Sequence, residues 1–192
     1  MSKTVLVPLA DGFEEIEAVT VIDVLRRADL EVVTAGIGDP SVARGAHGID
    51  VVPDVGIGDV DGPAIDMIVL PGGMPGAAAL QSDPRVQSLI EAVHERGGWT
   101  CAICAAPMAL GPSGVTAGRT VTSYPGFGER FEHGTYLEER VVVDGRVVTS
   151  RSPGTAMEFA LTLVEKLVGP EKAGELSRTM LVERPAPAYE TR

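Results

Sequence analysis

The sequence predicts an α/β fold in which a mostly parallel sheet is covered by helices on both faces. Apolar runs of strand length alternate with amphipathic stretches along the whole chain, which is the pattern of such a sheet. One apolar run ends in Gly72-Gly73, and another ends in a sharp turn around Cys104. The 192 residues fall within the roughly 100 to 200 expected of one domain. With no internal repeat or low-complexity linker, residues 1–192 are predicted to form a single domain.

Each predicted element follows from its local pattern. Strands are predicted at the short apolar runs, residues 5–9, 30–35, 65–70 and 99–103, and as a hairpin over 140–150 that turns at Asp144-Gly145. Helices are predicted at the amphipathic stretches, residues 14–27, 84–96 and 155–168, with others starting at 105 and 170. The first strand, helix and second strand form a βαβ unit. The tail after about residue 183 contains two prolines and is predicted to be irregular.

The charge and aromatic content of the chain argue against two kinds of partner, nucleic acid and membranes. Lys and Arg total 16 against 27 Asp and Glu, so the net charge of -11 would repel a phosphate backbone or an anionic membrane surface. Aromatic residues make up only 4%, which leaves little material for stacking on bases. The first residues show no secretory signal, and no stretch is long enough to span a membrane. We therefore expect no nucleic-acid partner, no membrane and a cytoplasmic location.

The segment around Cys104 has the form of a nucleophile elbow. Ala102 and Ala106 flank the cysteine two positions away on either side, and such a turn tolerates only small residues there. At the start of the helix predicted from residue 105, the helix dipole and free N–H groups would favour thiolate and lower the pKa of Cys104. The alternative is that Cys104 is only a small buried hydrophobe.

Cys101 and Cys104 also form a C-x-x-C pair, which can indicate a thioredoxin-like dithiol. A dithiol motif needs both sulfurs in the first turn of a helix, whereas Cys101 falls within the predicted strand over 99–103. A buried strand residue is therefore the better interpretation of Cys101. Two cysteines this close would constrain the unfolded chain little, so a reducing compartment fits best.

Glu17 lies on the apolar border of the helix predicted over 14–27. It shares a ridge with Val21 at i+4 and Val24 at i+7, so its carboxyl is expected to be at least partly buried. Burial raises the pKa of a carboxyl group, and a protonated Glu17 beside a thiolate could donate a hydrogen bond to it. The alternative is an ordinary solvated surface charge.

Gly72 and Gly73 follow the predicted strand over 65–70, at the edge where open α/β sheets bind their ligands. Their N–H groups, with that of Ala105, could form an oxyanion site near Cys104, or the glycines could serve only the turn. The three histidines, His47, His94 and His133, show no metal-site spacing and are interpreted as surface residues. We expect neither a metal nor another cofactor.

Five ordered blocks of the chain resemble the ThiJ/PfpI superfamily and, within it, the Parkinson-disease deglycase clade with its bacterial relatives. The blocks cover nearly the whole chain and are residues 11–17 (DGFEEIE), 70–76 (LPGGMPG), 102–107 (AICAAP), 122–125 (TSYP) and 149–155 (TSRSPGT). The resemblance implies a flavodoxin-like three-layer sandwich, usually a homodimer.

The resemblance also implies roles for individual residues. Cys104 matches the nucleophile, Glu17 the protonated glutamate, and Gly73 with Ala105 the oxyanion donors. Tyr124 replaces a histidine that some relatives carry, and its phenol could position a substrate. Ala105 follows Cys104 where protease-like members have a histidine, which argues against a peptidase.

The activity that the resemblance implies is a glutathione-independent glyoxalase or deglycase acting on methylglyoxal or related reactive carbonyls. In this chemistry a thiolate adds to a carbonyl and a carboxyl group moves protons between neighbouring carbons. Two alternatives remain. One is a non-enzymatic oxidative-stress sensor or chaperone in which Cys104 is oxidised to sulfinic acid. The other is a specialised hydrolase or lyase that reuses the same site.

Overall fold

A central sheet of eight strands organises the computed structural model, which describes residues 3–38, 42–131, 133–182 and 188–191. In spatial order the strands are β12 (Tyr189–Glu190), β10 (Val141–Asp144), β11 (Val147–Ser150), β7 (Trp99–Ile103), β6 (Met67–Leu70), β1 (Thr4–Leu9), β2 (Glu31–Gly36) and β5 (Val55–Gly56). From β11 to β5 all neighbours pair in parallel, whereas β10 runs antiparallel to β11. The carboxyl ends of β1, β6, β7 and β11 therefore share one edge.

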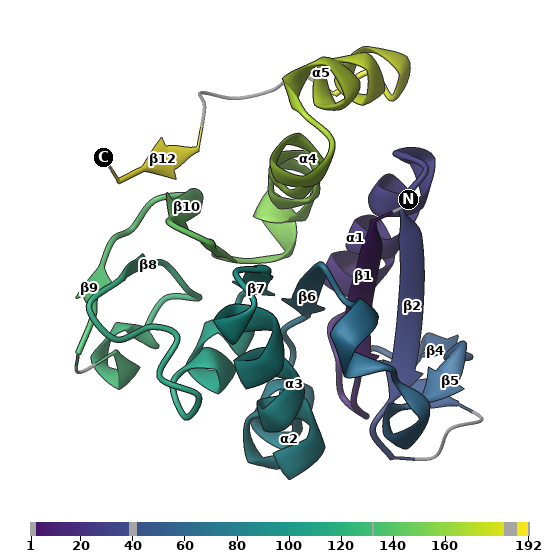
Figure 1. The fold of residues 1–192 in the computed structure, drawn as a ribbon, viewed down its shortest axis with the longest axis vertical. Coiled ribbons are helices and arrows are strands. Elements are labelled where there is room, and N and C mark those ends of the chain that lie inside the picture. The colour runs from purple at the N-terminus through teal and green to yellow at the C-terminus, as the bar shows by residue number, and fades with distance from the viewer. Residues whose placement is uncertain (1–2, 39–41, 132, 183–187, 192) are drawn as a thin grey trace.

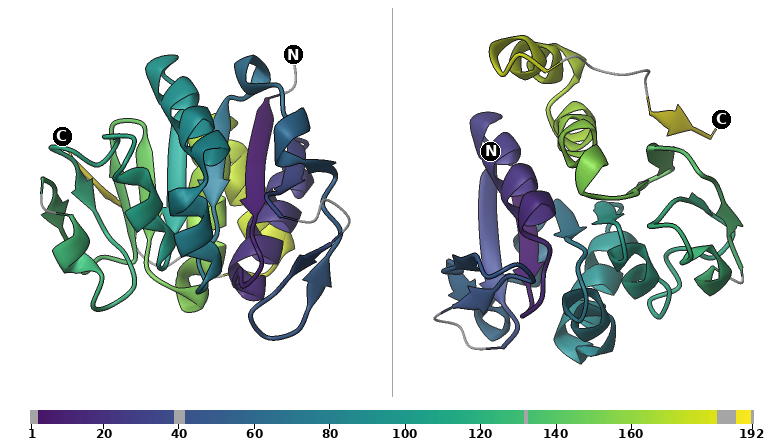
Figure 2. Two further views of the ribbon diagram at one scale, coloured as in Figure 1. Left: turned by 90° about the horizontal axis from the view of Figure 1, so that it is seen from below. Right: turned by 180° about the vertical axis from the view of Figure 1, so that it is seen from behind.

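Helices cover both faces of this sheet (Figures 1 and 2). One face packs against α1 (Glu15–Arg27), α4 (Ala156–Leu167) and α5 (Pro170–Thr179). The other face packs against α2 (Gly76–Ser82), α3 (Pro84–Glu95) and a short 3-10 helix at Ala106–Leu110. Two buried apolar clusters, one on each side of the sheet, follow from this arrangement. The three layers confirm the flavodoxin-like fold class that the sequence predicts.

The remaining elements are short. Two-residue strands form small ladders of β3 (Ala43–Arg44) with β4 (Asp50–Val51), and of β8 (Thr120–Val121) with β9 (Thr135–Tyr136). Further 3-10 helices lie at Ile57–Asp59, Gly62–Ala64, Gly128–Arg130 and Pro153–Thr155. In the part of the chain that the structure describes, no helix has the length and apolar character needed to cross a bilayer.

Helix α1 has a buried acidic start. Glu14 is the N-cap, and its Oε2 accepts a hydrogen bond from the N–H of Glu17 at 2.8 Å. Such a cap satisfies one of the free N–H groups of the first turn and stabilises a helix by about 1 kcal/mol. The helix ends before Asp29, whose φ of 61° is left-handed. This cap fixes the first turn of α1 against the sheet, with Glu17 on its buried side.

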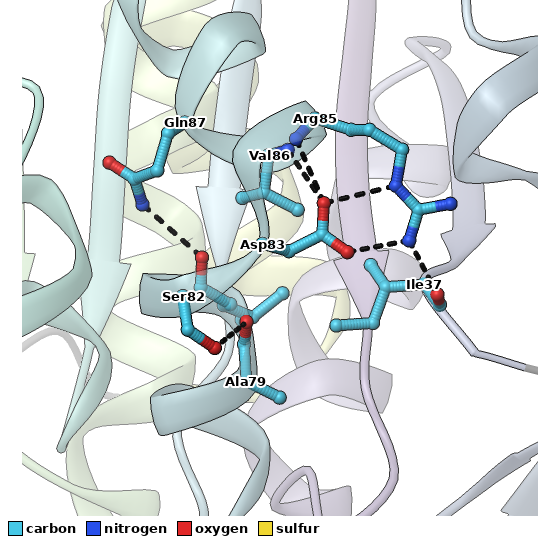
Figure 3. A network of polar contacts seen from close by, with 8 residues as sticks. Ile37, Ala79, Ser82, Asp83, Arg85, Val86 and Gln87 are labelled. Carbon is cyan, nitrogen blue, oxygen red and sulfur yellow. Dashed lines mark hydrogen bonds and ion pairs between the residues drawn. The ribbon is translucent and has the colours of Figure 1, made fainter.

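The junction of α2 and α3 is held by Asp83 (Figure 3). Its Oδ1 caps α3 by accepting the N–H of Arg85 at 2.9 Å. The guanidinium of Arg85 then bridges the carboxylate of Asp83 and the carbonyl of Ile37, at 2.8 Å from the latter, just after β2. The start of α3 is thereby tied to the end of β2.

Most predicted elements are confirmed, and two predictions are wrong. The predicted helix from residue 105 is only the five-residue 3-10 helix, after which Gly111 and Pro112 lead into turns. The tail is not wholly irregular: residues 183–187 lie outside the described ranges, but Tyr189–Glu190 forms β12 and pairs with β10. The hairpin of β10 and β11 turns at Asp144-Gly145 as predicted.

Candidate active site

Cys104 stands on a strained turn at the carboxyl end of β7. Its φ of 64° is left-handed, a conformation that costs a residue with a side chain about 1–2 kcal/mol. Two backbone hydrogen bonds hold it there. The Cys104 N–H donates to the carbonyl of Ser150 at 3.0 Å, and its carbonyl accepts from the N–H of Tyr124 at 2.8 Å. Ala102 and Ala106 are fully buried beside the turn, as the elbow pattern predicts.

Glu17 reaches the same point from α1. Its side chain is 0% exposed, and its Oε2 accepts the N–H of Gly72 at 2.8 Å. Its other oxygen, Oε1, is buried with no hydrogen-bond partner among the described residues. A side chain at position 72 would not fit, because a Cβ there would lie 2.6 Å from both Cys104 Cβ and Glu17 Oε2. Gly72 is thus the gap that lets the carboxyl and the cysteine approach each other.

Burial raises the pKa of Glu17 to about 7, and the nearby charge of Glu14 adds to the rise. The hydrogen bonds with Gly72 and Cys104 act in the opposite direction but are weaker. The sequence-based expectation of a buried glutamate with a raised pKa is therefore confirmed. At neutral pH both the ionised and the protonated form of Glu17 are populated.

The prediction of a lowered pKa for Cys104 is wrong. Burial raises the pKa of Cys104 to about 12, and the charge of Glu17 and the hydrogen bond to it add to the rise. Cys104 is only 9% exposed. The 3-10 helix that follows it is too short to supply the helix dipole that the prediction assumed. Since two of these causes need an ionised Glu17, the thiol and the carboxyl hold their protons as a coupled pair.

Two backbone N–H groups, those of Ala105 and Gly73, interact with the sulfur of Cys104 and act to lower its pKa. Both were expected near the cysteine. Gly72 differs from the expectation, because its N–H is taken by Glu17. Gly73 adopts a φ of 89°, and a Cβ there would lie 2.5 Å from the backbone nitrogen of Glu14. The pair of donors beside the sulfur is therefore Gly73 and Ala105.

Tyr124 lies beside the elbow through its backbone and is half-exposed, at 46%. Its ring meets that of Phe127 edge-on, with centroids 6.5 Å apart. No hydrogen bond of its hydroxyl is present among the described residues. The phenol is therefore available to a ligand.

Cys101 has none of these neighbours. It is 0% exposed in the middle of β7, as expected of a strand residue, and burial raises its pKa. Both cysteines are free thiols.

The histidines differ in part from the expectation. His47 is exposed, but its Nδ1 lies 2.8 Å from Oε2 of the buried Glu15. Glu14, Glu15 and His47 offer possible metal-ligand atoms within 4.8 Å of one another. The carboxyl oxygens of Glu15 already accept hydrogen bonds from His47 and Ile49. His94 is only partly exposed, and its Nδ1 is buried without a partner in the described part of the chain.

Sequence reasoning missed two residues that position the site. Glu14 orients Glu17 through the helix cap, and the carbonyl of Ser150 holds the N–H of Cys104. A glutamate is an uncommon N-cap, so nothing in the local pattern singles out Glu14 from the other acids. Glu14 and Ser150 each lie within one of the five blocks, which is the only signal that pointed to them.

The fold and the site together define an α/β protein with a cysteine on a nucleophile elbow and a buried carboxyl group beside it. The chain belongs to the DJ-1/PfpI family, whose model matches residues 3–166.

Named relatives support this assignment. The chain is 42% identical over 192 residues to Protein DJ-1 homolog A of Arabidopsis thaliana, covering 98% of this chain but only 49% of that protein, so it spans about half of that relative's length. It is 40% identical to the Glutathione-independent glyoxalase DJR-1.2 of Caenorhabditis elegans, with 95% of this chain and 97% of that protein covered. The crystal structure of Drosophila melanogaster DJ-1beta matches with a TM-score of 0.92 at 39% identity, covering 95% of this chain and all of that one.

Proposed function

We propose that this protein is a glutathione-independent glyoxalase that converts methylglyoxal or a related small carbonyl compound, with Cys104 as nucleophile. The observation that carries the proposal is the contact of a buried carboxyl group with a thiol on a strained elbow, beside two N–H donors. The 40% identity to a relative named as a glyoxalase supports the same class of reaction. Related deglycase chemistry would use the same groups in the same order.

The first step is addition of the thiol to the aldehyde carbon. Ionised Glu17 accepts the thiol proton as the C–S bond forms, which explains why a pKa of about 12 does not prevent attack. The oxygen of the carbonyl gains negative charge, and the N–H groups of Gly73 and Ala105 stabilise it. Protonated Glu17 then gives its proton to this oxygen, so that a hemithioacetal forms and the carboxylate is regenerated.

The second step moves one proton between neighbouring carbons. The carboxylate of Glu17 removes the proton from the carbon bonded to sulfur, giving an enediolate, and the protonated Glu17 returns it to the adjacent carbon, while the hydroxyl proton passes from the first oxygen to the second. The product is a thioester of lactate on Cys104. Water cleaves this thioester, releasing lactate and the thiol, so that methylglyoxal and one water give lactic acid. Because Glu17 must start ionised, turnover is expected to rise with pH through about 7.

The test is a lactate assay with methylglyoxal in the absence of glutathione. Wild-type protein is expected to form lactate, and Cys104→Ala is expected to lose at least about 1,000-fold in kcat/KM, since no covalent adduct can form. Glu17→Gln keeps the size of the side chain but removes proton transfer, so its loss should be comparable.

Cys101→Ala is the matched control, because it deletes a thiol of the same strand that does not reach the site. Its activity should stay within about twofold of wild type. Absence of lactate from folded wild-type protein, with Cys104 still readily oxidised by peroxide, would overturn the glyoxalase proposal and favour the role of an oxidation sensor.

We further propose that the chain is one domain and acts as a cytoplasmic homodimer. The sheet takes strands from both ends of the chain, which supports a single domain.

Four large apolar side chains are exposed on α1 and around β4, namely Ile16 at 58%, Val19 at 45%, Ile49 at 59% and Val52 at 74%. Val19 and Val52 line one shallow pocket, and the N–H of Ile49 contacts Glu15. A second copy would cover this apolar face.

Light scattering after size-exclusion chromatography is expected to give twice the chain mass of 20.0 kDa. Val52→Glu should shift the protein toward the monomer, because it places a charge within the face. A monomeric wild-type protein at micromolar concentration would contradict the dimer.

A further inference from the structure

A pocket lies at the edge of the sheet opposite Cys104. It has a volume of about 330 Å³ and collects the residues at or just before the first positions of four parallel strands, Lys3, Asp66, Trp99 and Arg146. The end of α3 adds Arg96, and the end of α4 adds Lys166. In the left-hand view of Figure 2 this edge lies on the side where the chain enters β1. The cysteine turn follows the far ends of the same strands.

The pocket is rich in positive charge. Its lining holds four cationic side chains, Lys3, Arg96, Arg146 and Lys166, and one carboxylate, Asp66. The whole chain carries 27 acidic residues against 16 basic ones, so this concentration of cations is opposite in sign to the molecule as a whole. A concave site with an excess of one sign of charge attracts a small ion of opposite charge.

Not all of these cations are neutralised by the protein. Lys3 pairs with Asp66 at 2.7 Å, and Lys166 pairs with Glu190 of β12. Arg96 donates to the carbonyl of Gly62 but, like Arg146, forms no ion pair within the described ranges. Two guanidinium groups at one pocket thus lack an ion-pair partner among the described residues.

Arg146 is held in place by the only tryptophan of the chain. Its guanidinium carbon lies 4.7 Å from the centre of the Trp99 ring, a cation–π contact. Trp99 is itself nearly buried, at 8% exposed. The ring contacts the guanidinium at its central carbon. The N–H groups of a guanidinium point outward in its own plane and are the groups that bind oxyanions. The ring therefore pre-orients the group.

We propose that this pocket binds a small phosphate-bearing anion. The planar fork of Arg146 matches two phosphate oxygens, and the second guanidinium, Arg96, supplies further charge. A pocket of about 330 Å³ leaves room for a small organic group beyond the phosphate. This site is separate from the cysteine turn and does not depend on the proposed glyoxalase reaction.

The single tryptophan makes the test specific, because fluorescence excited at a wavelength that only tryptophan absorbs reports on this pocket. Titration of wild-type protein with inorganic pyrophosphate is expected to give a saturable change in Trp99 emission, against a sodium chloride control at equal ionic strength. Arg146→Gln should weaken binding by at least about tenfold. Calorimetric titration supplies a readout that does not depend on the altered surroundings of the ring.

Arg178→Gln is the matched control. It removes the same charge from α5, where Arg178 forms no ion pair among the described residues and does not line the pocket. Its affinity for pyrophosphate should equal that of wild type. Equal weakening in both arginine variants, or a fluorescence change no larger than that in sodium chloride, would overturn the proposal and leave Arg146 as a residue that only packs on Trp99.

Discussion

Cys101 and Cys104 are the same residue type three positions apart and both are buried, but they differ in backbone conformation and in the groups beside the sulfur. Cys101 lies inside β7 in ordinary strand geometry and is fully buried, and burial is what raises its pKa. Cys104 lies one residue past the end of the strand with a φ of 64°, in contact with Glu17 and two N–H groups. The comparison teaches that burial alone makes a cysteine inert.

What distinguishes Cys104 is a partner that can take its proton. Burial raises the pKa of both thiols, so neither is a thiolate at neutral pH on the strength of its surroundings. Only Cys104 has a carboxyl group whose pKa of about 7 allows it to accept and release a proton under ordinary conditions. The backbone strain and the buried acid are thus parts of the same site.

The largest effect on stability is expected from replacing Glu17, the carboxyl partner that only Cys104 has. A pKa raised from 4.5 to about 7 means that the folded protein keeps a proton that the unfolded chain has released, so stability falls as pH rises through this window. The loss amounts to about 3 kcal/mol by pH 8, at about 1.4 kcal/mol per unit of pKa. Glu17→Gln removes this pH-dependent loss of stability. Urea unfolding at pH 5 and pH 8 should show the variant gaining on wild type by most of that amount at the higher pH, because part of the loss is already present at pH 5.

Glu15→Gln is the control of opposite sign. Burial alone would raise the pKa of Glu15, but hydrogen bonds from His47 and Ile49 lower it to about 2. Ionised Glu15 therefore stabilises the fold above about pH 4.5, and this stabilisation is lost as pH falls toward 2. The variant should lose stability relative to wild type at neutral pH. If both variants shifted with pH in the same direction, the contrast between the two carboxyl groups would be wrong.

A smaller effect is expected from the strained backbone itself. At position 104 glycine relieves the left-handed conformation, so Cys104→Gly should be more stable than Cys104→Ala by about 1 kcal/mol. At position 101 the order should reverse, because glycine in a strand is less stable than alanine by about 0.5–1 kcal/mol. Unfolding of the four variants in urea measures both differences. If alanine were more stable than glycine at both positions, the elbow would carry no strain.

The sequence predicted those parts of the fold that follow from local pattern. The βαβ start, the strand before Cys104 and the hairpin at Asp144-Gly145 have clear periodicity or turn residues, and the structure confirms them. Glu17 was recognised by its place on an apolar ridge. These signals lie within about one helix or one turn of the residues concerned.

The features of the fold and the site that were not predicted depend on contacts between distant segments of the chain. The N–H of Gly72 and the carboxyl of Glu17 are 55 positions apart, so no local pattern shows that this donor is already occupied. The raised pKa of Cys104 likewise reflects the burial that the whole fold imposes. The predicted helix after Cys104 failed because the prediction extended an alanine-rich start across Gly111 and Pro112, which interrupt it.

The short strand β12 has a consequence for how the protein behaves at high concentration. It adds Tyr189 and Glu190 to the outer side of β10, and the N–H of Thr191 donates to the carbonyl of Val143 at 3.1 Å. An open row of backbone donors and acceptors along the apolar strand β10 would invite pairing with another chain. At the opposite border the last strand, β5, has only two residues. The sheet therefore presents short strands at both borders, which protects it against edge-to-edge aggregation.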